Sequence, residues 1–253
     1  MENQPTVFSE NHRVTYYEAD FTRRMTIAMM LDVIILASED HSDKLGVGAE
    51  FVRQFGVTWV VIQYDVHINR MPVVDENITI NTKSKSYNKY FAYREFTIES
   101  ESGEVLMHMT GLWAAMNYKE RKIASIPKET VEPFGAEKVN QVPKMPKPQK
   151  VQYNEETKQS FRVRYTDIDS NQHVNNAHYM DWMVNVLPAD FLTNHTPTHF
   201  LLRYENEVKY GSTVESYYDM EELVDGSILT KHEIMSGESH SAIANITWRK
   251  KND

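Results

Sequence analysis

The sequence contains an internal repeat, which constrains the fold more than any other feature. Residues 13–16 (RVTY) match residues 162–165 (RVRY) at an offset of 149 (162 minus 13). Residues 60–65 (VVIQYD) resemble residues 200–205 (FLLRYE) at an offset of 140 (200 minus 60). Because both matches occur in the same order, with a shorter loop in the second half, they indicate a duplicated unit. The chain is therefore expected to fold as two similar halves.

Each half has the pattern of an α+β unit. One helix is expected from Ile27 to Ala37, a stretch that is apolar nearly all round except for Asp32. A second helix is expected to carry Val174 on its one apolar face. Runs rich in β-branched and aromatic residues predict strands, and the turn residues between them predict hairpins. These runs are residues 58–68, 77–85, 90–100, 105–117, 200–208, 213–222, 228–236 and 241–249. The predicted fold is α+β, with two tandem units in which a long helix is wrapped by a curled antiparallel sheet.

A segment rich in proline and lysine lies between the halves, at residues 127–150. Proline removes backbone donors and holds the chain extended, so this segment is predicted to be a linker. With the boundary near residue 140, the predicted domains are residues 1–139 and residues 140–253.

The composition excludes several classes of protein. The chain has no cysteine, which rules out disulfides, thiolate metal sites and a cysteine nucleophile. A net charge of −9 argues against a nucleic-acid binder, and it means that an acidic partner would dock on a local basic patch. The sequence shows neither a long apolar run nor a secretory signal at residues 1–6, so a cytoplasmic location is expected. No metal or cofactor is expected, because the histidines lack metal-ligand spacing and the glycines form no phosphate loop.

Three polar residues alternate just ahead of the second predicted helix. Asp169, Asn171 and His173 occupy every other position, so their side chains point the same way in an extended segment. The helix N-terminus beside them offers free N–H groups and a positive dipole end, which suit a carbonyl that develops negative charge. A hydrolytic or acyl-transfer site is one interpretation, and a simple helix cap is the other. Asp20 stands at the position of Asp169 in the first half, which fits a structural role shared by both halves.

This motif resembles that of the acyl-acyl-carrier-protein thioesterase family. The similarity is carried by residues 169–176 (DSNQHVNN) and, less specifically, by residues 202–207 (LRYENE), and it runs from about residue 8 to about residue 250. The resemblance implies two tandem hotdog units and hydrolysis of fatty acyl-acyl-carrier-protein thioesters, which terminates fatty acid elongation. Plant members have a plastid-targeting extension that this sequence lacks, so the resemblance is to a bacterial-type member.

The resemblance also implies which residues are catalytic. By position, the catalytic residues of the family fall on Asp169, Asn171, His173 and Glu207. Plant members have a cysteine after that glutamate, where this chain has Val208, so attack by an activated water is expected. The first half has Thr22, Arg24 and His67 where the second has Asn171, His173 and Glu207. The first half is therefore predicted to be a degenerate repeat that binds the acyl chain.

The chemistry assigns a role to each residue but leaves one choice open. Glu207 or Asp169 could accept a proton from water, and the sequence does not decide between them. Asn171 and the N–H groups of the helix could stabilise the oxyanion. His173 could orient a carboxylate or relay a proton.

The apolar first helix and the strand after it offer candidates for an acyl-binding site. Methionine is flexible and fills irregular apolar space, which suits a ligand of variable length, although plain core packing explains each residue taken alone. The candidates are Met25, Met29, Met30, Ile34 and Trp59.

Acyl carrier protein is acidic, so the partner implied by the resemblance needs a basic docking patch. One candidate patch consists of Lys83, Lys85, Lys89 and Arg94, and another lies at residues 249–251. The alternatives to this function are an acyl-coenzyme A thioesterase and a non-catalytic acyl-binding module. The sequence leaves open whether the repeats close on each other as a monomer or pair again as a homodimer.

Overall fold

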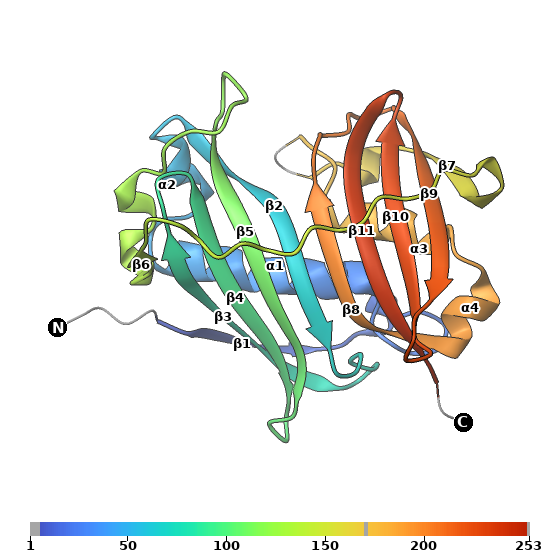
Figure 1. Cartoon of the computed structure of the whole chain (residues 1–253). Coiled ribbons are helices and arrows are strands. Elements are labelled where there is room, and N and C mark those ends of the chain that lie inside the picture. Colours follow the sequence, from blue (N-terminus) through green and yellow to red (C-terminus); the bar gives the residue numbers. More distant parts are fainter. Residues whose placement is uncertain (1–5, 170–171, 252–253) are drawn as a thin grey trace.

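The computed structural model describes residues 6–169 and 172–251, and each half places a strand and a long helix before a set of antiparallel strands (Figure 1). The N-terminal half consists of β1 (Phe8–Arg13), α1 (Ile27–Lys44), α2 (Ala49–Arg53), β2 (Val57–Ile68), β3 (Asn77–Tyr87), β4 (Phe91–Ser100) and β5 (Val105–Asn117). The C-terminal half consists of β7 (Lys158–Arg162), α3 (Asn176–Asn185), α4 (Ala189–Asn194), β8 (His195–Tyr204), β9 (Thr213–Glu222), β10 (Ile228–Ser236) and β11 (Ser239–Lys250). Along the chain, the short strand β6 (Glu137–Lys138) comes between the strands of the two halves. The predicted α+β class is confirmed.

Within the described residues, one sheet runs through both halves. Its strand order is β1-β3-β4-β5-β2-β8-β11-β10-β9-β7, and β6 pairs with β3. β2 and β8 join the halves as antiparallel neighbours, from Gln63 opposite Arg203 to His67 opposite His199. Each half is a curled sheet around a helix, and the two together form the tandem hotdog architecture that the family resemblance implied (Figure 1).

The helices lie on one face of this sheet (Figure 1). α1 begins after Thr26, whose hydroxyl accepts the N–H of Met29 at 3.2 Å. Its buried residues include Ile27, Ala28, Met30, Leu31, Val33, Ile34 and Ala37, as expected for a helix that is apolar nearly all round. The exception, Asp32, accepts a hydrogen bond of 2.9 Å from the side chain of Asn175, just before α3. Among the described residues, no helix is both long and apolar enough to cross a membrane.

The last strand before Glu207 ends earlier than the sequence predicts. β8 ends at Tyr204 rather than at residue 208. Beyond it, the N–H groups of Glu205 and Asn206 both donate to the carbonyl of Ser241, at 2.9 and 3.2 Å. These bonds turn the chain out of the ladder, so Glu207 lies after the strand rather than within it.

The segment between the halves crosses the outer face of the sheet. Figure 1 shows it in front of the strands of both halves, on the side opposite α1. In β2, the side chain of Gln63 donates to the carbonyl of Pro146. In β11, Asn245 accepts the N–H of Gln149 at 2.6 Å and donates to its carbonyl at 3.0 Å. The extended chain favoured by its prolines is thus bound to a strand of each half.

Replacement of Asn245 by alanine tests these linker contacts. Asn245 is buried, and the variant would leave two backbone groups of Gln149 unpaired. We expect the free energy of unfolding to fall by about 1–3 kcal/mol, and limited proteolysis to cut the linker faster. Urea denaturation and proteolysis measure the two effects, with the exposed linker variant Lys147→Ala as the control. An Asn245→Ala protein as stable and resistant as its parent would contradict the prediction.

Candidate active site

A tight loop precedes α3 and holds two of the predicted catalytic residues. The N–H of Asp169 donates to the carbonyl of His173 at 2.8 Å, and the N–H of Gln172 donates to the carbonyl of Asp169 at 3.0 Å. One carboxylate oxygen of Asp169 also accepts the N–H of His173 at 3.3 Å. Gln172 has φ of +66°, an uncommon left-handed conformation that lets the chain turn back on itself. The predicted catalytic Asn171 lies outside the described residues, as does Ser170.

The first half contains the same loop 149 residues earlier. The N–H of Asp20 donates to the carbonyl of Arg24 at 2.9 Å, and Arg23, with φ of +66°, donates to the carbonyl of Asp20 at 2.9 Å. Asp20 also accepts the N–H of Arg24 at 3.4 Å. The carboxylate at this position therefore holds the loop in both halves. Thr26 and Asn175 then cap α1 and α3, and their side chains accept the N–H groups of Met29 and Ala177.

His173 meets a carboxylate and a guanidinium at the end of the sheet. Its Nε2 lies 3.2 Å from Nη1 of Arg121 and 3.5 Å from Oε2 of Glu207, and Arg121 also forms an ion pair with Glu207. Since a guanidinium can only donate, Nε2 of His173 must accept, which places the ring proton on Nδ1. The structure thus brings together two of the predicted residues, His173 and Glu207.

The electrostatics around His173 favour the neutral imidazole. Burial lowers the pKa of His173, the charge of Arg121 lowers this pKa further, and Asp169 acts in the opposite direction. A neutral imidazole near neutral pH can accept a proton, or a hydrogen bond from a water, through Nε2.

Arg121 was not predicted from the sequence, and it comes from the other half. It lies in the turn after β5, at φ of +56°, where the side chain of Asn117 accepts the N–H groups of Lys119 and Glu120 at 2.9 and 2.8 Å. Arg121 is 52 residues from His173 and 86 from Glu207 along the chain. No local pattern marks such a contact. The candidate active site therefore lies between the halves.

Two carboxylates of α1 lie close to the same loop. Asp32 is bonded to Asn175, and burial raises the pKa of Asp32. Burial also raises the pKa of Glu39, and the charges of Asp43 and Asp169 raise it further. The N-terminal half thus contributes charged groups to this region as well as apolar ones.

The residues predicted to bind an acyl chain lie in two places. Met25, Met30 and Ile34 are buried in the main core, and Met29 is packed against it. Trp59 lies instead in a small separate cluster with Val52 of α2, Val57 at the start of β2 and Ala115 of β5. The three α1 residues and Met25, just before the helix, therefore form one apolar group, and Trp59 is not part of it.

The predicted basic patch is wrong in one member. Arg94 is only 8% exposed, donates to the hydroxyl of Thr82 at 3.2 Å and lies over the ring of Phe134. It pairs with Ser84 across β3 and β4, so it shares the inner face of the sheet with that residue. Lys83 and Lys85, on the other face, both form ion pairs with Glu95. Lys89 is exposed.

The fold and this site define a class, the tandem hotdog proteins with an imidazole–carboxylate pair in one of the two repeats. Residues 5–134 match the family profile of the acyl-ACP thioesterase N-terminal domain, and residues 150–250 match that of the C-terminal domain. The chain belongs to the acyl-ACP thioesterase family.

Individual relatives agree with this assignment. An acyl-[acyl-carrier-protein] hydrolase of Cuphea viscosissima is 26% identical over 97% of this chain, and the chain spans 63% of the length of that relative. A crystal structure of a Lactobacillus plantarum protein, provisionally described as an oleoyl thioesterase, is 42% identical and covers 98% of both chains with a TM-score of 0.95. A 12:0-ACP thioesterase of Umbellularia californica, 24% identical over 97% of this chain and 98% of its own, shares the fold with a TM-score of 0.82.

Replacement of Arg121 by glutamine tests the electrostatics of the site. The variant removes the guanidinium that disfavours the imidazolium and leaves the Glu207 carboxylate near Nε2, and both changes favour protonation. We therefore expect the pKa of His173 to rise, as measured by NMR titration of its ring protons. Lys122→Gln removes the same charge from the next residue and should raise the pKa of His173 less. A pKa that is unchanged or lower in Arg121→Gln would contradict the assigned contact.

Proposed function

We propose that this protein hydrolyses fatty acyl-acyl-carrier-protein thioesters to free fatty acid and carrier protein, in the cytoplasm, and so terminates fatty acid elongation. The observation that carries the proposal is the His173–Glu207 pair beside the N-terminal end of α3. The first half has Arg24 and His67 at these positions, so only one repeat retains the imidazole–carboxylate pair. Membership of the acyl-ACP thioesterase family supports the same reaction.

Of the two candidate carboxylates, Glu207 and Asp169, we assign the role of general base to Glu207. Asp169 accepts the N–H of His173, as Asp20 accepts that of Arg24 in a loop without this pair, so a structural role accounts for Asp169. Glu207 is 42% exposed in its side chain and lies 3.5 Å from the imidazole of His173. A water held by these two groups would lose its proton to Glu207 as its oxygen bonds to the thioester carbon. The C–S bond then breaks, and the thiolate leaves with that proton.

In this mechanism, the side chain of Arg121 must move away from Glu207 before Glu207 can act as the base. An ion pair with a guanidinium favours the ionised carboxylate and so weakens it as a base. The guanidinium of Arg121 would therefore turn from Glu207 to the thioester oxygen when substrate enters, and with Asn171 it would stabilise the oxyanion. The same movement frees Glu207 to accept the proton.

The acyl chain would enter the apolar group on α1. Met29, Met30 and Ile34 lie on this helix and Met25 lies just before it. Asp32 of the same helix is bonded to the capping residue of α3. An acyl chain would have to displace packed side chains there, which flexible methionines allow more readily than branched residues. The position of Trp59 in another cluster makes it a weaker candidate.

The carrier protein would dock at the end of the sheet that holds Arg121. The carbonyl of Lys89 accepts the N–H of Ile126, a few residues after Arg121, so the β3–β4 turn lies beside this end. Lys89, Lys119 and Lys122 are all exposed there. An acidic carrier protein complements these charges. The ion pairs of Lys83 and Lys85 with Glu95 make that face less suitable.

Release of free fatty acid from a panel of acyl-acyl-carrier-proteins and acyl-coenzyme A thioesters tests the function. We expect release from the carrier-protein thioesters with a higher kcat/KM than from the matching coenzyme A thioesters. Faster release from coenzyme A would favour the acyl-coenzyme A thioesterase. Binding of both without release would leave an acyl-binding module.

Two carboxylate variants separate the base from the loop residue. Glu207→Gln should lower kcat by about 10²–10⁴-fold, because the water loses its base. Asp169→Asn should lower kcat less, because the amide oxygen can still accept the N–H of His173. Glu205→Gln, which changes an exposed neighbouring carboxylate, is the control. Steady-state kinetics on one acyl-acyl-carrier-protein measures all three, and a larger loss in Asp169→Asn than in Glu207→Gln would reverse the assignment.

Met30→Ala tests the acyl-binding group. Met30 is fully buried on α1, so its truncation opens space there. We expect the ratio of kcat/KM for longer over shorter acyl chains to rise, which a loss of stability alone would not cause. Met220→Ala, at an exposed methionine, should leave the ratio unchanged. An unchanged ratio in Met30→Ala would argue against a chain-binding role.

A further inference from the structure

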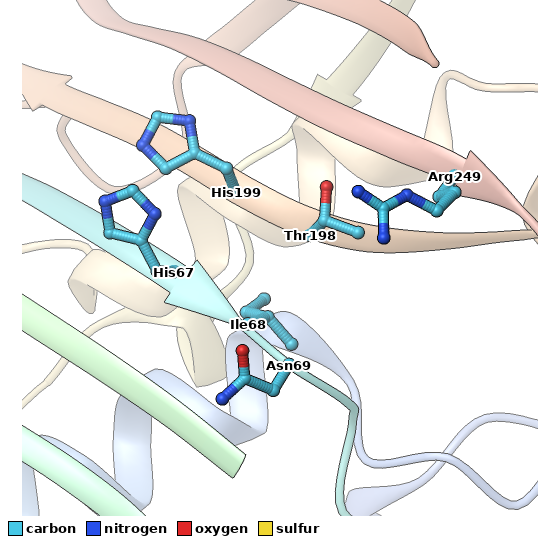
Figure 2. A pocket seen from close by; sticks show the side chains of 6 residues that line it. All are labelled: His67, Ile68, Asn69, Thr198, His199 and Arg249. Atoms are coloured by element: carbon cyan, nitrogen blue, oxygen red, sulfur yellow. The ribbon is translucent and has the colours of Figure 1, made fainter. Parts of the chain in front are cut away.

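Two histidines and an aspartate converge where the halves join. His67 of β2 and His199 of β8 are directly opposite each other, with ring centroids 4.4 Å apart. Oδ1 of Asp65 lies 2.8 Å from Nε2 of His199 and 3.5 Å from Nε2 of His67. One ligand atom from each of the three residues lies within 4.8 Å of the others. Figure 2 shows the two imidazoles side by side on neighbouring strands.

This cluster lies on the outer face of the sheet. Asp65 and His67 flank Val66, which is fully buried, and His199 precedes the equally buried Phe200. Because side chains alternate along a strand, the three polar residues point away from the core. Two of them, His67 and His199, also line a pocket of about 380 Å³ that includes Thr198 and Asn69 (Figure 2). A solvated ion can therefore reach them.

The atoms fit a divalent transition metal. Zinc bound tetrahedrally at about 2.0–2.1 Å from nitrogen and oxygen sets its ligand atoms about 3.3 Å apart. The two distances to Asp65 lie on either side of this value. Burial lowers the pKa of His67 and so favours the neutral ring, which is the form that binds a metal. Two imidazoles and one carboxylate match zinc better than Mg²⁺ or Ca²⁺, which prefer oxygen ligands.

Two further basic side chains, His108 and Arg249, lie near the cluster. His108 of β5 is opposite His67, on the side away from β8. Arg249 lines the same pocket, but Figure 2 shows its side chain on the far side of Thr198 from the imidazoles. Asp65, with a side chain only 17% exposed, supplies the compensating charge directly at the ligand atoms.

We propose that Asp65, His67 and His199 form a binding site for Zn²⁺ that links the two halves of the chain. His67 belongs to the N-terminal half and His199 to the C-terminal half, so one ion would fasten β2 to β8. β2 begins opposite Asn117, near the turn of Arg121, and His67 lies ten residues further on, about 33 Å away along a strand. The ion therefore has a structural role and takes no part in thioester hydrolysis.

Isothermal titration of the chelator-treated full-length protein with ZnCl₂ tests the site. We expect one ion per chain, and an affinity at least about 10-fold lower in each of Asp65→Asn, His67→Ala and His199→Ala. Zinc should also raise the Tm of the parent protein more than that of the variants. MgCl₂ should give neither effect.

His12→Ala is the matched control. His12 also contacts a carboxylate, that of Glu18 at 3.0 Å, but this contact involves one histidine and not two. It should bind zinc like the parent. The side chain of His67 is 64% exposed, so its loss should leave the fold intact, as circular dichroism can verify. Absence of stoichiometric binding, or equal affinity in the parent, His67→Ala and His199→Ala, would overturn the proposal.

Discussion

The pairing of β2 with β8 is the interaction on which the rest of the structure depends. It joins two curled sheets into one, from Gln63 opposite Arg203 to His67 opposite His199. Because the strands are antiparallel, the turn after β5 comes beside the segment that follows β8, and Arg121 reaches Glu207. A shift of one residue would turn every side chain of a strand to the other face and separate these groups. A hydrophobic interface without a ladder would not fix the register so strictly.

Duplication explains how one half acquired the site and the other a structural contact. Both halves have the same loop, with a left-handed residue and an aspartate that holds it closed. At the position of His173 the first half has Arg24, which donates to the carbonyls of Leu192 and His195 and to the hydroxyl of Thr196, at 2.8–3.1 Å. Each loop thus extends one side chain to the opposite half. In one loop that side chain binds the other half, and in the other it meets Glu207 and Arg121.

The sequence was sufficient for what depends on local pattern and order. Apolar periodicity and turn residues predicted both long helices and eight strands, and the offset of 149 aligned the two loops. Contacts between side chains on different strands could not be predicted from the sequence. Arg94 was wrongly assigned to a surface patch with Lys83 and Lys85. The residues are close in the sequence, but closeness in the sequence does not tell which face of a strand a side chain occupies. The position of Arg94 opposite Ser84 turns it inward. The approach of Arg121 to His173 likewise depends on how the two halves pair, which no single segment encodes.

The ion pair between Arg121 and Glu207 suits the proposed mechanism, in which Arg121 leaves Glu207 when substrate enters. Their side chains are 40% and 42% exposed, and ion pairs at such exposure contribute only about 0–1 kcal/mol to stability. In the proposed reaction, a substrate that excludes water and offers Arg121 a developing oxyanion would therefore have only a weak ion pair to break. A buried pair would resist separation, because removing one partner leaves an uncompensated charge. Under this proposal, the shallow position of the pair would let Arg121 hold Glu207 beside His173 at rest and release it when a thioester binds.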